Sequence, residues 1–308
     1  MKICMLGAGS LGSAIGGTLA AGGSDVTLID TYKEHVDAIN IAGLVLHTAD
    51  GEKPVKVRAV LNSEGLKPAD LVIVLVKSFH TKEAMLRARN LVGPDTVVMS
   101  IQNGLGHEDV LAEVVGRGHV MAAKTYVGGM LLKPGHTVCG AVGKETIIGE
   151  LDGSVTERAN AIADEFNRAG LKAVVSDNIV GTMWDKLLIN VATGAVSAIT
   201  RLPYGKLYAA PEVEAIAIAA VTEAITAARK LGVVLSIHEP REAWLKAGAG
   251  LPYDFKPSML QSIEKGHRTE VDFINGAVVR AGQRAGVPTP VNETLVACVK
   301  GIERGFAS

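Results

Sequence analysis

The sequence contains few of the residues that mark several large classes of protein. Aromatic residues make up only 4% of the 308 residues, so stacking platforms for single-stranded nucleic acid are not expected. Lysine and arginine (31) balance aspartate and glutamate (32), which argues against nucleic acid or an anionic membrane as a partner. The three cysteines, Cys4, Cys139 and Cys298, are far apart, so we expect neither a disulfide framework nor a zinc site.

Long apolar runs are also absent. The most apolar stretch, Leu71 to Val76, stops at Lys77 and is far shorter than the ~20 residues of a membrane-spanning helix. The start of the chain lacks the basic residues and long apolar run of a signal peptide, so we expect a cytoplasmic protein. The eight histidines are scattered and form no HExxH motif, and we expect no metal.

The N-terminal half alternates short apolar runs with segments of helical pattern, which predicts a doubly wound, mostly parallel α/β sheet of the Rossmann type. The expected strands are Lys2 to Leu6, Asp25 to Ile29, Leu71 to Val76, Thr96 to Ile101 and Ala173 to Val175. The expected helices are Gly12 to Ala21, Thr31 to Ala42, Thr81 to Leu91 and Thr156 to Ala169. Val138 to Gly143 and Glu145 to Gly149 are expected to pair as a hairpin.

Strand signals almost vanish beyond Asp177. Long helical patterns cover Ile179 to Ala198, Pro211 to Leu231 and Glu270 to Ala285. A chain of this length favours two domains. We therefore predict a dinucleotide-binding domain over residues 1–176 and an all-α domain over residues 177–308, whose apolar helices bury either a core or the interface of a homodimer.

A glycine-rich motif follows the first expected strand. Its residues are Gly7, Ala8, Gly9, Ser10, Leu11 and Gly12. The spacing GxGxxG between a strand and a helix is typical of a turn that binds the diphosphate of a dinucleotide at the helix N-terminus. The first glycine allows the tight turn, the second lets the backbone approach the diphosphate, and the third lets the helix lie close to the strand. The alternative is a glycine-rich turn without a ligand.

Asp30 ends the second expected strand, about 20 residues beyond the motif. An acidic residue at this place hydrogen-bonds the ribose 2′-hydroxyl, and it would repel the 2′-phosphate of NADP. No arginine follows, and Lys33 is the nearest cation. The sequence therefore favours NAD, with NADP possible. The alternative is that Asp30 only caps the following helix.

Polar residues interrupt two apolar segments of the C-terminal part. Lys186, Asn190 and Gly194 follow one another at intervals of one helical turn and share one face. The Lys and Asn either serve a site or are a snorkelling Lys beside a buried, hydrogen-bonded Asn. Thr269 and Glu270 resemble a capping box that opens the next helix, which would put the Glu270 carboxylate at a helix N-terminus. From local sequence alone, a surface acid in the first turn explains Glu270 better than a functional carboxylate does.

Together these segments resemble the ketopantoate reductase (2-dehydropantoate 2-reductase) family from Lys2 to about Ala285. The most specific segments are Gly7 to Gly12, Ile101 to Gly104, Lys186 to Asn190, Ser258 to Gln261, and Arg268 to Gly276. The resemblance implies an oxidoreductase that acts on CH–OH groups with NAD(P), and whose substrate is a 2-keto acid.

The resemblance also implies roles for individual residues. Lys186 is similar to the general acid that protonates the ketone oxygen, and Glu270 to the carboxylate that orients the substrate and the Lys. Asn103 resembles the Asn beside the nicotinamide and the substrate. Asn190 and Ser258 resemble substrate-binding residues, and Lys77 a lysine near the cofactor.

Two positions depart from the family pattern. Gly194 stands where the family usually has a second Asn, and Asp30 stands where NADPH-using members carry a basic residue close by. These departures leave two alternatives open. One is an NAD-dependent reductase of another branched 2-keto or 3-keto acid on the same scaffold. The other is a non-catalytic dinucleotide-binding sensor in which Lys186 and Glu270 are dispensable.

Overall fold

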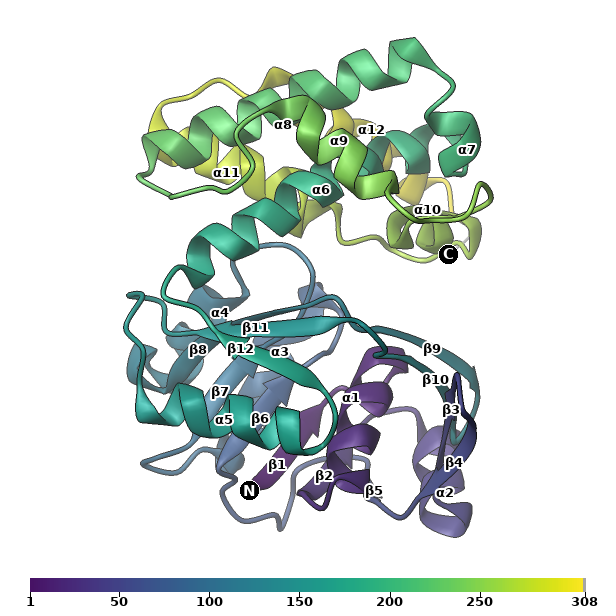
Figure 1. Ribbon diagram of the computed structural model, residues 1–308, viewed down its shortest axis with the longest axis vertical. Coiled ribbons are helices and arrows are strands. Elements are labelled where there is room, and N and C mark those ends of the chain that lie inside the picture. The colour runs from purple at the N-terminus through teal and green to yellow at the C-terminus, as the bar shows by residue number, and fades with distance from the viewer. Residues whose placement is uncertain (307–308) are drawn as a thin grey trace. The chain divides into compact units, whose positions relative to one another are not determined.

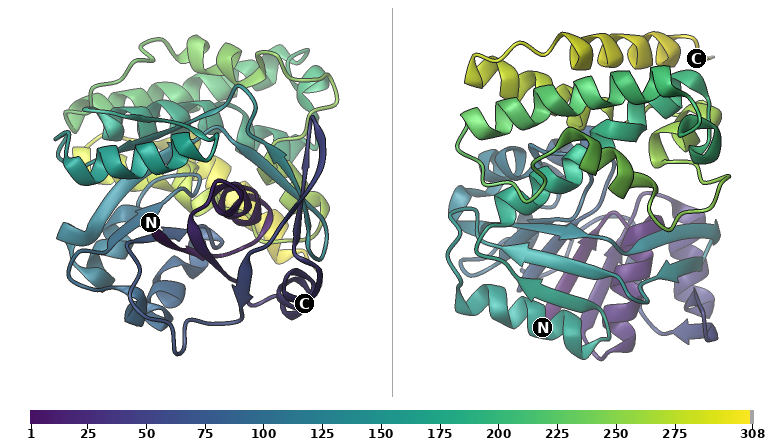
Figure 2. Two further views of the ribbon diagram at one scale, coloured as in Figure 1. Left: turned by 60° about the horizontal axis from the view of Figure 1, so that its bottom comes forward. Right: turned by 45° about the horizontal axis from the view of Figure 1, so that its top comes forward.

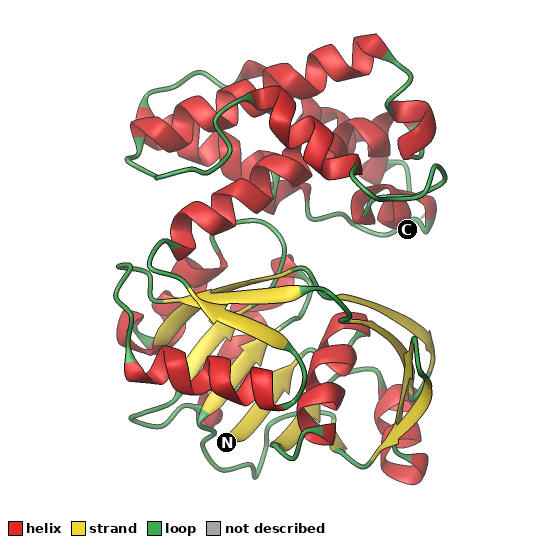
Figure 3. Cartoon of the chain, in the orientation of Figure 1, coloured by secondary structure: helices red, strands yellow, loops and turns green. Residues whose placement is uncertain are grey.

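The computed structural model describes residues 1–306, and its contacts divide the chain into two compact units. Unit 1 contains residues 1–102 and 107–179, and unit 2 contains residues 103–106 and the chain from Val180 onward. The α/β sheet followed by an all-helical part, as expected from the sequence, is confirmed (Figure 3). Within the described chain, no helix is long and apolar enough to cross a membrane.

Unit 1 is built on a sheet of eight strands in the order β12-β11-β8-β7-β6-β1-β2-β5 (Figure 1). Neighbouring strands are parallel except for β8 and β11. The strands are β1 (Lys2–Leu6), β2 (Asp25–Ile29), β5 (Arg58–Val60), β6 (Leu71–Val74), β7 (Val97–Ser100), β8 (Val120–Thr125), β11 (Glu145–Gly149) and β12 (Lys172–Val175). The helices of the unit are α1 (Ser10–Ala21), α2 (Lys33–Ala42), α3 (Thr81–Arg87), α4 (His107–Val115) and α5 (Glu157–Arg168), with 3-10 turns η1 (Ser78–His80), η2 (Arg89–Leu91) and η3 (Arg117–His119).

The strands are apolar at successive positions because both faces of the sheet are covered. Ile3 and Met5 of β1 belong to one hydrophobic cluster, which includes side chains of α1 and α5. Cys4 and Leu6 belong to a second cluster with side chains of α3 and α4. Successive residues of a strand point to opposite faces, so each strand contributes to both clusters.

A second sheet, in the order β4-β3-β10-β9, was not predicted. Its strands are β3 (Leu44–Thr48), β4 (Gly51–Val55), β9 (Gly128–Lys133) and β10 (His136–Gly140). The expected hairpin of Val138 to Gly143 with Glu145 to Gly149 is wrong. The first segment pairs with β3 and β9 as part of β10, and the second pairs with β8 and β12 as β11. The turn at Gly143 therefore leads from one sheet to the other.

Several predicted boundaries are confirmed and others shift by a few residues. Strands β1 and β2 begin and end where expected. Helix α1 begins at Ser10, two positions before the predicted start at Gly12. Strand β6 ends at Val74 because the following backbone, Leu75 and Val76, closes on the glycine-rich turn. The helix predicted over Thr81 to Leu91 breaks into α3 and η2.

Unit 2 is helical around a single apolar cluster. Its helices are α6 (Ile179–Thr200), α7 (Tyr204–Leu207), α8 (Pro211–Lys230), α9 (Pro240–Gly248), α10 (Ser258–Glu264), α11 (Asn275–Ala285) and α12 (Pro290–Arg304), with the 3-10 turn η4 (Val271–Phe273). Figure 2 shows α8, α11 and α12 side by side in its right-hand view, and these helices contact one another.

The helix predicted over Glu270 to Ala285 begins later than expected. Residues Val271–Phe273 form the turn η4, and α11 begins at Asn275. Thr269 Oγ1 accepts a hydrogen bond from the amide of Val271 at 3.2 Å, so it shapes the turn and does not cap an α-helix. The break occurs because the Phe273 carbonyl accepts the amide of Leu105 at 2.9 Å and Ile274 has ψ −91°, outside the helical region.

Candidate functional site

The residues predicted to bind the cofactor follow the ends of parallel strands. Gly7 follows β1, Asp30 follows β2 and Lys77 lies three residues after β6. Strand β1 lies between β2 and β6 and is parallel to both, so all of them reach the same edge of the sheet. In such sheets, ligands bind outside the carboxyl ends of the strands, where the strand order reverses.

The glycine-rich turn has room for a ligand at only one of its three glycines. A Cβ at Gly7, which has φ +100°, would lie 2.5 Å from the amide nitrogen of Val76, and one at Gly12 would lie 2.0 Å from the carbonyl oxygen of Gly7. A Cβ at Gly9 would meet no atom within 4 Å. Ala8 is buried, and Ser10 and Leu11 open helix α1. These residues fit the diphosphate of a dinucleotide, since the open side of the turn carries the first amides of a helix.

Asp30 lies beside the turn and does not cap helix α2. Its Oδ1 accepts the amide of Tyr32 at 2.9 Å, and Tyr32 is itself the N-cap residue of α2. A carboxylate can accept several hydrogen bonds, so the group retains capacity for a ribose hydroxyl. Lys33, the nearest cation in sequence, forms an ion pair with Asp37.

Two predicted site residues of unit 2 lie on helix α6. Lys186 and Asn190 are half-buried, while Leu187, Leu188 and Val191 beside them are buried. Lys186 and Asn190 are therefore two polar residues on one face of an otherwise apolar helix, as the sequence predicted. Lys77 of unit 1 and Ser258, the first residue of α10, are exposed.

The surroundings of Gly194 are apolar. Gly194 is buried, and a Cβ at this position would lie 3.5 Å from Met259 Cε. The two nearest hydroxyls on α6 already have partners. Thr193 Oγ1 hydrogen-bonds the Tyr204 hydroxyl at 2.9 Å, and Ser197 donates to the Leu202 carbonyl at 2.7 Å.

A short loop carries Asn103 into unit 2. A Cβ at Gly104, which has φ +94°, would lie 2.2 Å from the carbonyl oxygen of Phe273. That carbonyl accepts the amide of Leu105. Only glycine allows this approach. The contact holds the loop that contains half-buried Asn103 against the segment that begins with half-buried Glu270. Unit 2 thus holds Asn103, Lys186, Asn190, Ser258 and Glu270.

Two polar residues that support this loop were not predicted. Gln102 donates from Nε2 to the Val76 carbonyl at 2.6 Å and to Thr81 Oγ1 at 2.9 Å. Lys124, only 2% exposed, donates from Nζ to the carbonyl of Gln102 at 3.2 Å. A lysine inside the apolar strand Val120–Thr125 is a signal that the sequence does carry.

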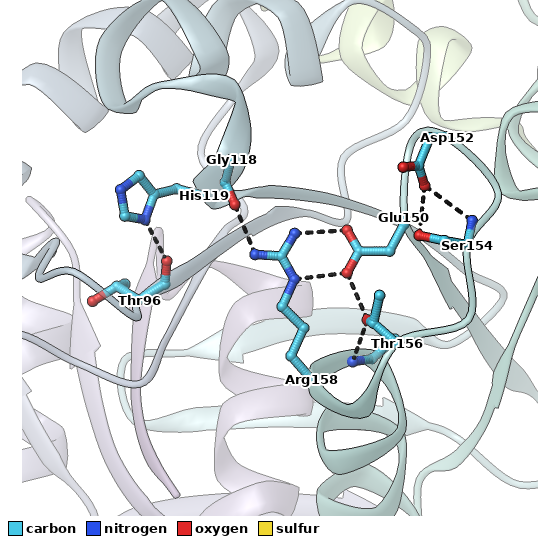
Figure 4. A network of polar contacts seen from close by, with 9 residues as sticks. Thr96, Gly118, His119, Glu150, Asp152, Ser154, Thr156 and Arg158 are labelled. Atoms are coloured by element: carbon cyan, nitrogen blue, oxygen red, sulfur yellow. Dashed lines mark hydrogen bonds and ion pairs between the residues drawn. The ribbon is translucent and has the colours of Figure 1, made fainter.

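Other charged residues of unit 1 hold the fold together (Figure 4). Glu150 accepts hydrogen bonds from Arg158 Nε at 2.6 Å and from Thr156 Oγ1 at 2.7 Å, and Arg158 also donates to the Gly118 carbonyl. Burial raises the pKa of Glu150, but these hydrogen bonds outweigh it and the pKa is lowered overall. Among the residues described, no group of three or more His, Cys, Asp or Glu is arranged to hold a metal.

Comparison with known proteins agrees with this architecture. Residues 3–153 match the model of the family described as ketopantoate reductase PanE/ApbA, and residues 178–303 match the model of its C-terminal part. A 2-dehydropantoate 2-reductase of Pyrococcus horikoshii is 36% identical over 303 residues, covering 98% of both chains. One of Halobacterium salinarum is 33% identical, covering 99% of both chains.

Solved structures give the same result. A PanE/ApbA family ketopantoate reductase from Ralstonia eutropha superposes with a TM-score of 0.90 at 36% identity, covering 99% of both chains. A D-mandelate dehydrogenase in complex with NADH and anilino(oxo)acetate superposes with a TM-score of 0.89 at 28% identity, covering 99% of both chains. With both of its parts matched by the family models and its whole length shared with such reductases, the chain belongs to the ketopantoate reductase (PanE/ApbA) family.

Proposed function

We propose that this protein reduces 2-dehydropantoate (ketopantoate) to (R)-pantoate, a step of pantothenate biosynthesis, with NAD(P)H as the hydride donor. The proposal is carried by the polar set of unit 2, in which Asn103, Lys186, Asn190, Ser258 and Glu270 come from four separate segments of the chain. Full-length relatives named 2-dehydropantoate 2-reductase favour ketopantoate over other branched 2-keto or 3-keto acids.

The reduction requires a hydride, a proton for the ketone oxygen and an anchor for the carboxylate. NAD(P)H supplies the hydride when bound. Lys186 acts as the general acid, because an ammonium group held at the carbonyl oxygen donates the proton that completes the hydroxyl. Glu270 orients the Lys and the substrate. Asn190 and Ser258 are assigned to substrate binding, and Asn103 to a place beside the nicotinamide and the substrate.

The glycine-rich turn, Lys77 and Asn103 are assigned to cofactor binding. Asp30 selects NADH, because the Asp30 carboxylate accepts hydrogen bonds from the adenosine ribose and repels a 2′-phosphate. The ion pair of Lys33 with Asp37 supports this preference, since it occupies the nearest cation in sequence.

The test is steady-state turnover of ketopantoate with NADH and NADPH side by side. We expect turnover with a higher kcat/KM for NADH, and Asp30→Ala should reduce that preference. A wild-type enzyme that prefers NADPH would contradict the role of Asp30. Reduction of a different keto acid, with none of ketopantoate, would retain the scaffold and reject the substrate.

We also expect the protein to be a cytoplasmic homodimer. Exposed apolar side chains of the helical unit, such as Ile216 on α8, would supply part of the dimer interface. Light scattering of the purified protein measures the mass of the particle in solution, and a monomeric mass would contradict the homodimer.

A further inference from the structure

Two buried polar residues of unit 1 are not used by the proposed function. Ser13 on α1 is 0% exposed and His35 on α2 is 1% exposed. His35 Nδ1 lies 3.0 Å from the amide nitrogen of Gly135, and its Nε2 lies 3.0 Å from Ser13 Oγ. Ser13 Oγ lies 2.6 Å from the carbonyl oxygen of Ala8. A chain of hydrogen bonds therefore runs from the β9–β10 turn to the glycine-rich turn.

The direction of each hydrogen bond follows from its donors. The Gly135 amide can only donate, so His35 Nδ1 must accept and the ring is neutral. The ring proton then lies on Nε2 and points to Ser13 Oγ. Ser13 in turn donates its single hydroxyl proton to Ala8, whose carbonyl oxygen can only accept. Each donor and acceptor of this chain is thus satisfied in one arrangement.

Holding the Ala8 carbonyl fixes the amide of the next residue. The carbonyl of Ala8 and the N–H of Gly9 belong to one planar trans peptide and point in opposite directions. Because the carbonyl points toward Ser13, the Gly9 N–H points away from it. A Cβ at Gly9 would meet no atom within 4 Å, so the turn is open at this residue, where the diphosphate would approach.

The second sheet supports the turn from outside. Leu131 of β9 donates its amide to Ser10 Oγ at 3.1 Å, and Thr137 of β10 donates its hydroxyl to the Ser10 carbonyl at 3.1 Å. A Cβ at Gly129 would lie 2.5 Å from the same carbonyl. In the left view of Figure 2, which looks along α1, strands of this sheet lie beside the helix.

We propose that Ser13 and His35 are positioning residues for the diphosphate of the dinucleotide, and that the second sheet anchors them through Gly135. This inference rests on the proposed function only in that the glycine-rich turn binds NAD(P)H. It does not depend on which keto acid is reduced.

The test measures dissociation constants for NADH and ADP-ribose by fluorescence titration and calorimetry, with the melting temperature of each ligand-free variant. Ser13→Ala should raise both constants roughly 3- to 10-fold, the contribution of the one neutral hydrogen bond that holds the Ala8 carbonyl. Thr18→Ala is the matched control, because Thr18 Oγ1 donates to the Ala14 carbonyl within the same helix. It should leave both constants unchanged.

Two substitutions of His35 separate positioning from packing. His35→Gln retains a donor near the place of Nε2 and should bind NADH within ~3-fold of wild type. His35→Asn retains an acceptor near Nδ1 for Gly135 but does not reach Ser13, so it should bind as weakly as Ser13→Ala. In all these variants, kcat at saturating NADH and the KM for the keto acid should change less than ~2-fold, since uniform binding alone is lost.

The outcomes are distinct. Wild-type dissociation constants in Ser13→Ala would overturn the inference, as would Gln and Asn variants that bind equally poorly and melt equally early. If the His35 variants do not fold, Ser13→Ala against Thr18→Ala decides. Failure of the wild type to bind NADH or ADP-ribose would instead reject the cofactor assignment itself.

Discussion

At the residue scale, Lys186 combines a charged group with an apolar setting. It is half-buried on α6, where Trp184, two residues before it, and Leu187, directly after it, are buried. An ammonium group held in this way has fewer waters to compete with a substrate oxygen. Such a group suits proton donation to a ketone, which the proposed function requires.

Replacing Lys186 by Ala should lower kcat by roughly 10²–10⁴, the usual contribution of general acid catalysis. The dissociation constant of NADH should hardly change, because the glycine-rich turn lies in the other unit. Lys206→Ala in the same unit is the control and should retain wild-type kcat. A near-wild-type kcat in Lys186→Ala would reject the assignment.

Gly194 should make the enzyme less strict about the substrate hydroxyl. An Asn would add a donor and an acceptor here, whereas Gly194 is next to Met259 and the hydroxyls of Thr193 and Ser197 have other partners. We expect measurable reduction of 2-ketoisovalerate, which lacks the hydroxyl of ketopantoate. Gly194→Asn should increase the ratio of kcat/KM for ketopantoate to that for ketoisovalerate. A wild type that already rejects ketoisovalerate by ~10⁴ or more would show that another group reads the hydroxyl.

At the scale of the elements, predictions succeeded where the signal is local. Strand β1, the glycine-rich turn and α1 adjoin in sequence, so apolar pattern and spacing were sufficient. The second sheet was missed because the strand that became β10 was given the wrong partner and because β4 carries little strand signal. Strand β4 reads Gly51–Val55 with Glu52, Lys53 and Pro54, and four of its five residues are exposed. The register of β4 is set by its pairing with β3. The other two strands of the sheet, β9 and β10, lie about 80 residues further along the chain.

The start of α11 shows the same limit at a single turn. Residues 269–272 have the local pattern of a capping box, but the Phe273 carbonyl bonds the amide of Leu105. A contact between residues so far apart in sequence leaves no trace in the spacing around Glu270. The role predicted for Glu270 does not depend on the helix start and stays a prediction.

Helix α12 should depend on a carboxylate from α8. Glu223 accepts the amides of Val291 at 2.8 Å and Asn292 at 3.0 Å, and also Asn292 Nδ2 at 2.7 Å. These amides belong to the first turn of α12 and have no partner within the helix. Glu223→Gln should therefore lower the free energy of unfolding by about 1–2 kcal/mol.

The control is Glu212→Gln, an exposed acid on the same helix, which should change stability by less than ~0.5 kcal/mol. Urea unfolding of both variants measures the difference. Equal midpoints would show that the cap contributes nothing.

At the scale of the whole molecule, no local pattern in the sequence indicates that the loop of residues 103–106 leaves unit 1 and joins the helical unit. The loop follows β7 directly, as an ordinary strand-to-helix connection would. Its assignment to unit 2 depends on Gly104 and Phe273, which approach each other only in the folded chain. Within unit 1, the buried Lys124 is tolerated in the sheet because its ammonium group donates to the carbonyl of Gln102.

The same region should make the stability of the protein depend on pH. Glu108, the second residue of α4, is 6% exposed. Burial raises the pKa of its carboxyl from 4.5 to about 7, with Lys124 acting in the opposite direction. The folded protein therefore keeps this proton between pH 4.5 and about 7, where the unfolded chain has lost it. The stability that this group contributes is fully present below pH 4.5 and is lost as the pH rises through 7.

Glu108→Gln mimics the protonated carboxyl at every pH, so its effect should appear only where the wild type has ionised. At pH 8 we expect the variant to be more stable than wild type by up to roughly 3 kcal/mol, since one unit of pKa corresponds to about 1.4 kcal/mol. At pH 4.5 the two should unfold at the same urea concentration. Glu113→Gln, on the exposed side of the same helix and paired with Lys82, should show no such change between the two pH values. A variant less stable than wild type at pH 8 would mean that the ionised carboxylate is held by its attraction to Lys124, and that this buried pair stabilises the fold.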